Sequence, residues 1–146
     1  MNKKAVLCGL ALASSLSFPA IARDTVADYS VKEAMSHPKA AQILGSDIQF
    51  YFGSQKHGSV SKNLGEIRTN QKTSAFAKSD KEACQWVFLS AMKALKKRAI
   101  ADGGNAVINI RSNYRNNETT SNTTFKCGAG AIIAGVALVG DVVVLK

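Results

Sequence analysis

Two cysteines and two histidines have side chains that could hold a metal or react: Cys84, Cys127, His37 and His57. Zinc sites draw on cysteine and histidine ligands in closely spaced pairs. Neither cysteine has such a neighbour, so the sequence predicts no metal site and no cofactor. A pair 43 positions apart can instead form one disulfide if the chain folds in an oxidising compartment. Two buried free thiols are the alternative.

Carboxylates are the next candidates, because glycoside hydrolysis needs two of them across the scissile bond. Asp102, Glu118 and Asp141 are the acidic residues late in the chain. We expect the first at a helix end and the second in a solvated loop, and no G-x-S-x-G nucleophile motif accompanies them. The sequence therefore predicts a protein without enzymatic activity. A hydrolase of envelope polymers is the alternative, which Glu66 and Asp47 facing each other in a cleft would favour.

A group of basic residues could bind an anionic polymer or a membrane surface. Its members are Lys93, Lys96, Lys97, Arg98, Arg111 and Arg115. The first four also fit an ordinary role, since cations near the C-terminal end of a helix complement its dipole and stay in water. The group forms one patch only if the helix and the later strand place it on the same surface.

Residues 1–22 have the three parts of a secretory signal peptide. Lys3 and Lys4 supply the positive charge, an apolar stretch follows, and Ala20-Ile21-Ala22 is a small-x-small cleavage site. The stretch is shorter than the roughly 20 apolar residues of a membrane span. We expect cleavage after Ala22 and a periplasmic or secreted protein. Cys8 lies too close to the lysines to be a lipoprotein cysteine, so it should leave with the signal.

Export changes how the rest of the chain is interpreted. Cleavage leaves 124 of the 146 residues, enough for one domain. They carry 17 Lys and Arg residues against 10 Asp and Glu residues, a net charge of +7. Outside the cytoplasm nucleic acid is the least available anionic partner, so an envelope protein or an anionic polymer is expected instead. In that compartment Cys84 and Cys127 should form the disulfide.

The elements that would position these residues begin with an N-terminal arm over 23–45. Its pattern predicts one short helix on each side of Pro38, with Gly45 as a stop. Alternating β-branched and aromatic residues predict strands at 47–52 and 59–73, the second interrupted at 63–65.

The strongest pattern in the chain predicts a helix over 80–102. Ser79 and Glu82 form a capping box, and Gly103-Gly104 ends the helix. A core-facing stripe recurs at helical spacing. Its members are Cys84, Phe88, Ala91, Leu95 and Ala99.

After this helix the pattern predicts a strand over 106–114, with Ala106, Ile108, Ile110 and Ser112 on its buried side. A polar loop at 116–122 and a returning strand at 123–127 would complete a hairpin. The apolar segment 128–145 could be read as a membrane span. Asp141 and four glycines favour a buried segment that ends in a strand at 141–145.

Three pieces in this order carry a family resemblance: Leu64-Gly65-Glu66-Ile67 on a strand, the junction Ala99 to Val107 with its Gly-Gly-Asn-Ala-Val, and Gly140-Asp141-Val142-Val143-Val144 at the end. Over 59–146 the chain resembles the YbjQ family, often labelled heavy-metal-binding. It also resembles the outer-membrane sensor lipoprotein of the Rcs envelope-stress phosphorelay, and small exported proteins labelled excinuclease-subunit-like. No nucleotide-binding motif accompanies the last label.

The resemblance implies an α+β fold in which a small antiparallel sheet packs against one long amphipathic helix, here with an N-terminal helical arm. We expect a signal peptide (1–22), the arm (23–45) and a single α/β domain (46–146). The resemblance also implies that Cys84 and Cys127 are bonded, and it leaves a homo-oligomer open. The sensor's lipid-anchoring cysteine is missing here.

The resulting expectation is an exported, non-enzymatic module that binds or senses a component of the envelope. Such a module would present an aromatic residue, Tyr51, Trp86 or Tyr114, beside basic residues.

Overall fold

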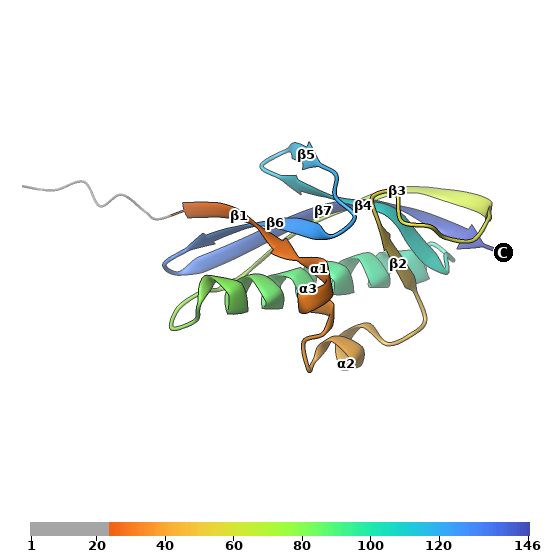
Figure 1. The fold of residues 1–146 in the computed structure, drawn as a ribbon. Helices are drawn as coiled ribbons and strands as arrows, with labels where there is room; N and C mark the ends of the chain where they lie inside the picture. Colours follow the sequence, from red (N-terminus) through yellow and green to blue (C-terminus); the bar gives the residue numbers. More distant parts are fainter. Residues whose placement is uncertain (1–23) are drawn as a thin grey trace, which may run out of the picture.

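The computed structural model describes residues 24–146 (Figure 1). The predicted signal peptide, Cys8 and the cleavage site lie outside the described residues. The described elements, in chain order, are β1 (Asp24–Ser30), α1 (Val31–Met35), α2 (Ala40–Leu44), β2 (Gln49–Phe52), β3 (Val60–Ser74), α3 (Asp80–Ala101), β4 (Ala106–Tyr114), β5 (Asn117–Thr119), β6 (Thr124–Gly130) and β7 (Ile133–Leu145).

One mixed sheet of seven strands dominates the described chain. Along its main path the order is β1-β6-β7-β4-β2, while β3 pairs with β7 and β5 with β4. β2 runs parallel to β4, and the other pairs are antiparallel. The α+β class fits, but the prediction of a small antiparallel sheet is wrong. The prediction missed the strands β1 and β5, and it limited the last strand to 141–145, whereas β7 begins at Ile133. It also missed that β2 runs parallel to β4.

β7 is the central strand. β3 pairs with it along one side from Ser74 to Val60, while β6 and β4 share the other side. Its run of Ala, Gly, Val and Leu suits a strand buried on both faces. The segment 128–145 is therefore the end of β6 and a continuous β7, joined as a hairpin. Among the described residues no helix is long and apolar enough to span a membrane.

The predicted helix is confirmed as α3, which lies beneath the sheet along its length (Figure 1). The Ser79 hydroxyl accepts a hydrogen bond from the Glu82 backbone amide at 3.1 Å. Gly103, just past the C-cap, has a φ of +82°, which explains why glycine ends the helix here. The predicted stripe is buried, from Cys84 to Ala99.

The N-terminal segment packs against the rest of the chain, and the prediction of a helical arm missed its first strand. Its first residues form β1, an edge strand on β6. The two short helices do lie on either side of Pro38, as predicted, and Gly45 follows α2. Val31, Ala34, Ala40 and Leu44 of these helices are buried in the same core as α3.

The predicted disulfide is present between Cys84 of α3 and Cys127 of β6. Both residues are fully buried. Nearby, the rings of Phe88 and Phe125 stack with centroids 4.2 Å apart. The bond and the aromatic pair join the helix to the β1–β6 side of the sheet.

A bulge in β4 decides which side chains point away from α3. Ile108 pairs with Asp141 and Arg111 with Val139, so β4 has one residue more than β7 between these pairs. The extra residue, Asn109, has a φ of +50°. Such a bulge breaks the alternation of a strand. Val107 and Ile110 therefore face the core beside α3, whereas Arg111 points to the opposite side. We call that side, away from α3, the outer face.

The bulge corrects the prediction for this strand, in which Ile108 and Ile110 shared a face. The predicted hairpin of 106–114 with 123–127 is also wrong. β4 turns back into the short β5, and β6 pairs with β1 and β7 instead. The β4–β5 hairpin rises above the outer face (Figure 1).

Candidate functional site on the outer face

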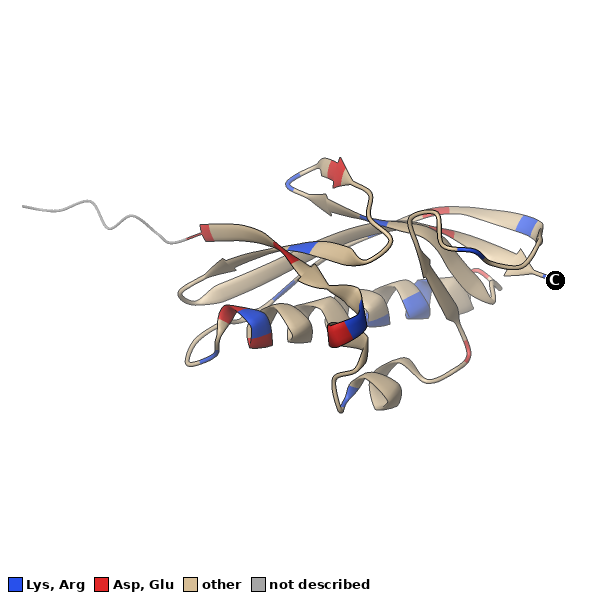
Figure 2. Cartoon of the chain, viewed as in Figure 1, with Lys and Arg blue, Asp and Glu red and all other residues tan. Residues whose placement is uncertain are grey.

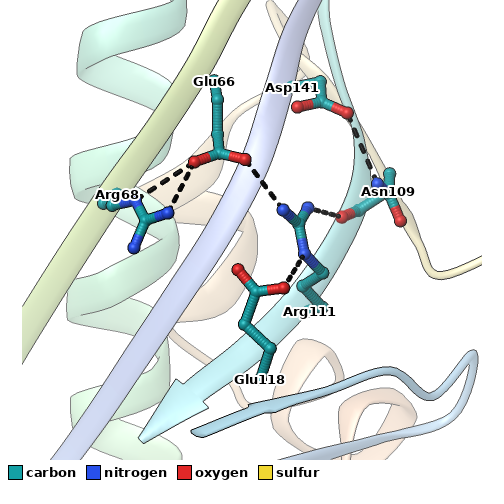
Figure 3. Close-up of polar contacts among 6 residues, drawn as sticks. All are labelled: Glu66, Arg68, Asn109, Arg111, Glu118 and Asp141. Atoms are coloured by element: carbon teal, nitrogen blue, oxygen red, sulfur yellow. Dashed lines mark hydrogen bonds and ion pairs between the residues drawn. The ribbon is translucent and has the colours of Figure 1, made fainter. Parts of the chain in front are cut away.

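Arg111 is the centre of a polar cluster on the outer face (Figure 3). Its guanidinium donates to Glu118 of β5 at 3.1 Å and to Glu66 of β3 at 2.9 Å. A third bond, at 3.0 Å, goes to the backbone carbonyl of Asn109 in the bulge. Only 11% of the side chain is exposed. Because β3 and β4 flank β7, these contacts cross over β7 above the buried Val139.

Glu66 receives a second guanidinium. Arg68, two residues along β3, donates to its other carboxylate oxygen at 3.1 and 2.9 Å. The hydrogen bonds from Arg68 and then Arg111 lower the pKa of Glu66 below its ordinary value. Glu66 is thus held ionised, and it is poorly suited to donate a proton as a general acid.

Burial alone would lower the pKa of Arg111, but the hydrogen bonds that Arg111 donates to Glu118 and Glu66 outweigh it and raise the pKa. Two carboxylates and two guanidiniums thereby neutralise one another. Glycosidases keep two carboxyl groups apart with substrate between them. In this cluster the Arg111 guanidinium lies between Glu66 and Glu118. The cluster therefore joins the β4–β5 hairpin to β3.

The other acidic residues considered for hydrolysis are dispersed. Asp141 accepts a hydrogen bond from the Asn109 side chain at 3.4 Å. Asp102 pairs with Arg98 at the end of α3. Asp47 lies 3.9 Å from Lys96 on the α3 side, so it does not face Glu66 in a cleft. Within residues 24–146 no three His, Cys, Asp or Glu side chains gather as metal ligands.

The tip of the β4–β5 hairpin lies against β1. Its two central residues, Arg115 and Asn116, have φ values of +52° and +61°, as in a tight two-residue hairpin turn. Arg115 forms an ion pair with Asp24. Its guanidinium carbon also lies 5.3 Å from the centre of the Tyr114 ring. These contacts hold Tyr114 over the outer face.

Beside Tyr114 is a groove of about 550 Å³, within the size range of small-molecule sites. We call it the outer-face groove. Its lining residues are Asp24, Asn70, Lys72, Tyr114, Arg115, Gly128, Gly130, Ala131, Ile132, Ile133, Gly135 and Ala137. A hollow of about 310 Å³ that also includes Arg68 and Asn113 shares Asn70, Arg115 and Ala137 with it. The groove therefore has an apolar floor with amide and cationic groups at its rim.

The predicted basic residues do not form one patch (Figure 2). Lys93, Lys96, Lys97 and Arg98 are on α3, whereas Arg111 and Arg115 lie on or above the outer face. Four of the six have acidic neighbours: Lys96, Arg98, Arg111 and Arg115. Lys93 and Lys97 are exposed, and no ion pair involves them in the described part of the chain.

Of the three aromatic residues considered, Tyr114 lies beside Arg115 in the larger groove, and Tyr51 lines a smaller hollow that includes Lys146. Trp86 contacts His37, and Tyr51 donates to Gln49 at 2.5 Å. Sequence reasoning missed Lys72 and the floor residues. Alternation along β3 could have placed Asn70 and Lys72 on one face, but the glycines opposite them are known only from the strand pairing.

Comparison with known proteins leaves the family open. No protein-family model matches the chain, and no curated protein matches it significantly. A solved structure of similar shape is that of a protein of unknown function from Pediococcus pentosaceus ATCC 25745, which belongs to the DUF74 family. It is 14% identical, with a TM-score of 0.46, over 68% of this chain and 98% of that one. These values support no conclusion about family or function.

Proposed function

We propose that the chain is an exported, periplasmic or secreted, non-enzymatic module that binds a component of the envelope in its outer-face groove. The groove carries the proposal, because it combines an apolar floor with Tyr114, Asn70 and Lys72. Ligand sites in proteins share this pairing of apolar surface with a few polar groups. We also propose that the chain is related to the YbjQ family or to the stress sensor. The proposed function does not rest on this relationship.

Export is supported by the pattern of residues 1–22 and by the disulfide. Cys84 and Cys127 are the two cysteines left after cleavage, and they are bonded. Disulfides of this kind persist in oxidising compartments and are rare in the cytosol. Mass spectrometry of the protein from its native host should give Arg23 as the first residue.

The absence of enzymatic activity is supported by the ion pairs that hold both carboxylates of the polar cluster. The Glu66 carboxylate is held by two arginines and the Glu118 carboxylate by one. Neither is free to act as acid or base without breaking a charge-assisted hydrogen bond.

A second candidate function is binding to an anionic polymer or membrane surface through α3. One observation favours it: Lys93 and Lys97 are exposed without an ion pair within residues 24–146. Such binding would weaken steeply with added salt.

One capture experiment separates the two candidates. The mature, oxidised protein is immobilised and exposed to envelope extract, beside an Ala137→Phe variant and a Lys93→Ala/Lys97→Ala variant. Ala137 lines the groove, so a phenyl ring there should fill it. We expect a stoichiometric partner that the lysine variant keeps and the phenylalanine variant loses.

Circular dichroism and the thermal midpoint check that each variant is folded. Loss of the partner from the lysine variant alone would favour binding through α3. If no partner is retained by the wild-type protein under any salt condition, the proposed function is wrong.

A further inference from the structure

Resting on the proposed function, we infer that the outer-face groove binds an anionic amphiphile, a single apolar chain that ends in one negatively charged group. Lys72 is the residue that points to this class of ligand. It is exposed on the groove, and no ion pair involves it among residues 24–146. The other cations at the rim already have partners, Arg68 with Glu66 and Arg115 with Asp24.

The floor of the groove leaves room for a chain at Gly135, whereas the Tyr114 ring fills the space above Gly128. Gly128 and Gly135 pair with each other in the β6–β7 hairpin, and both lack side chains on the outer face. A Cβ atom on Gly128 would collide with the Tyr114 hydroxyl. A Cβ atom on Gly135 would lie 3.7 Å from Cε2 of Tyr114 and 3.8 Å from Cγ of Lys72. The tyrosine ring therefore packs on Gly128, and with the lysine stem it borders an opening over Gly135 that holds no side chain.

The end of the groove is apolar and open to solvent. Ile132 and Ile133 are 67% and 54% exposed. Phe76, which is 73% exposed, is in the neighbouring loop, where the Ala75 amide donates to the Ile132 carbonyl at 2.6 Å. Large exposed apolar side chains gathered at one place mark a contact surface. A bound chain would cover Ile132 and Ile133.

These positions give the ligand a direction. Asn70 and Lys72 are two residues apart on β3, so they share the outer face and lie opposite Ala137 and Gly135 of β7. Ile133 is two residues before Gly135 on β7. The charged head would therefore contact Lys72 and Asn70, while the chain lies over Gly135 towards Ile133.

The test is isothermal titration of the oxidised mature protein with decanoate below its micelle concentration. Decyl phosphate tests the second common anionic head, decyl maltoside has the chain without charge, and acetate has the charge without a chain. We expect one decanoate per protein, comparable binding of decyl phosphate, and much weaker binding of maltoside and acetate.

Three lysine variants locate the charge. Lys72→Met keeps most of the apolar stem and should weaken decanoate binding by at least roughly tenfold, the usual effect of losing one charge-assisted hydrogen bond. Lys72→Arg should restore it, and Lys93→Met should bind as the wild type does. The inference is overturned if decanoate does not bind, if maltoside binds equally well, or if Lys72→Met is without effect. Retention of a groove-dependent partner in the capture experiment would then still support the proposed function.

Discussion

At the scale of single residues, Arg111 connects three strands on the outer face, the side away from α3. It bonds to Glu66 on β3, to Glu118 on β5 and to the bulge of its own strand. Charge-assisted hydrogen bonds of this kind are stronger than neutral ones. The cluster therefore contributes to the order of the hairpin that carries Tyr114, and through it to the groove.

The acid sensitivity of this cluster is a first prediction. Because the folded pKa of Glu66 is below its unfolded value, its contribution to stability is complete above the unfolded pKa of about 4.3. That contribution is lost as the pH falls through the lowered folded pKa. Glu66→Gln should thus be less stable than the wild type at pH 7, and the difference should shrink in acid. Urea unfolding at a series of pH values measures it.

A background with Arg68→Met and Arg111→Met controls for the loss of one carboxylate. There the Glu66→Gln difference should no longer depend on pH in this way. A difference that stayed constant from neutral to strongly acidic pH in the wild-type background would contradict the role assigned to the arginines.

At the scale of elements, the bulge in β4 gives a second prediction. Asn109 has a φ of +50°, a conformation that asparagine and glycine adopt far more readily than a β-branched residue. Asn109→Gly should remain close to the wild type in stability, whereas Asn109→Val should lose about 1–2 kcal/mol or more. Both changes remove the hydrogen bond to Asp141, so the comparison isolates the backbone. Equal unfolding free energies for the two variants would show that the bulge is not strained.

Some of these elements could be predicted from the sequence and others could not. α3 was predictable because Ser79, Glu82 and Gly103 are local signals that act within one or two turns. The bulge was not, because one asparagine inside an alternating strand resembles a solvent-facing position until the register with β7 is known. β1 was missed since Asp24–Ser30 is polar and exposed, and its strand character comes from pairing with β6.

The groove, like the bulge and β1, could not be predicted from the sequence. Its lining comes from β1, β3, β4, β6 and β7 and the β6–β7 turn, so only the assembled sheet brings Lys72, Tyr114 and Gly135 together. The disulfide, in contrast, followed from composition and compartment, because two cysteines allow a single pairing.

At the scale of the whole molecule, the disulfide gives a third prediction. It closes a loop between residues 43 positions apart, which a chain-entropy estimate values at about 4 kcal/mol. Replacing both Cys84 and Cys127 by Ala should therefore lower the thermal midpoint by roughly 10–20 °C. Reductant should destabilise the wild type and leave the double variant unchanged. An equal response of the two proteins to reductant would contradict this contribution.

The bond joins α3 to β6, which contributes Gly128 and Gly130 to the groove, and Gly128 follows Cys127 directly. Charged residues are spread over both sides of the molecule (Figure 2). The exposed Lys93 and Lys97 lie on α3, whereas the groove is lined by residues of the sheet and its turns. This separation allows the two candidate binding surfaces to be told apart in the folded protein.

The most direct measurement is a map of backbone amide chemical shifts of the oxidised mature protein during titration with decanoate. We predict saturable shifts at Lys72, Gly128, Gly135 and Ala137, with Lys93 and Lys97 unmoved. Shifts confined to α3, or a groove whose signals do not move, would contradict the assignment of the outer face as the binding surface.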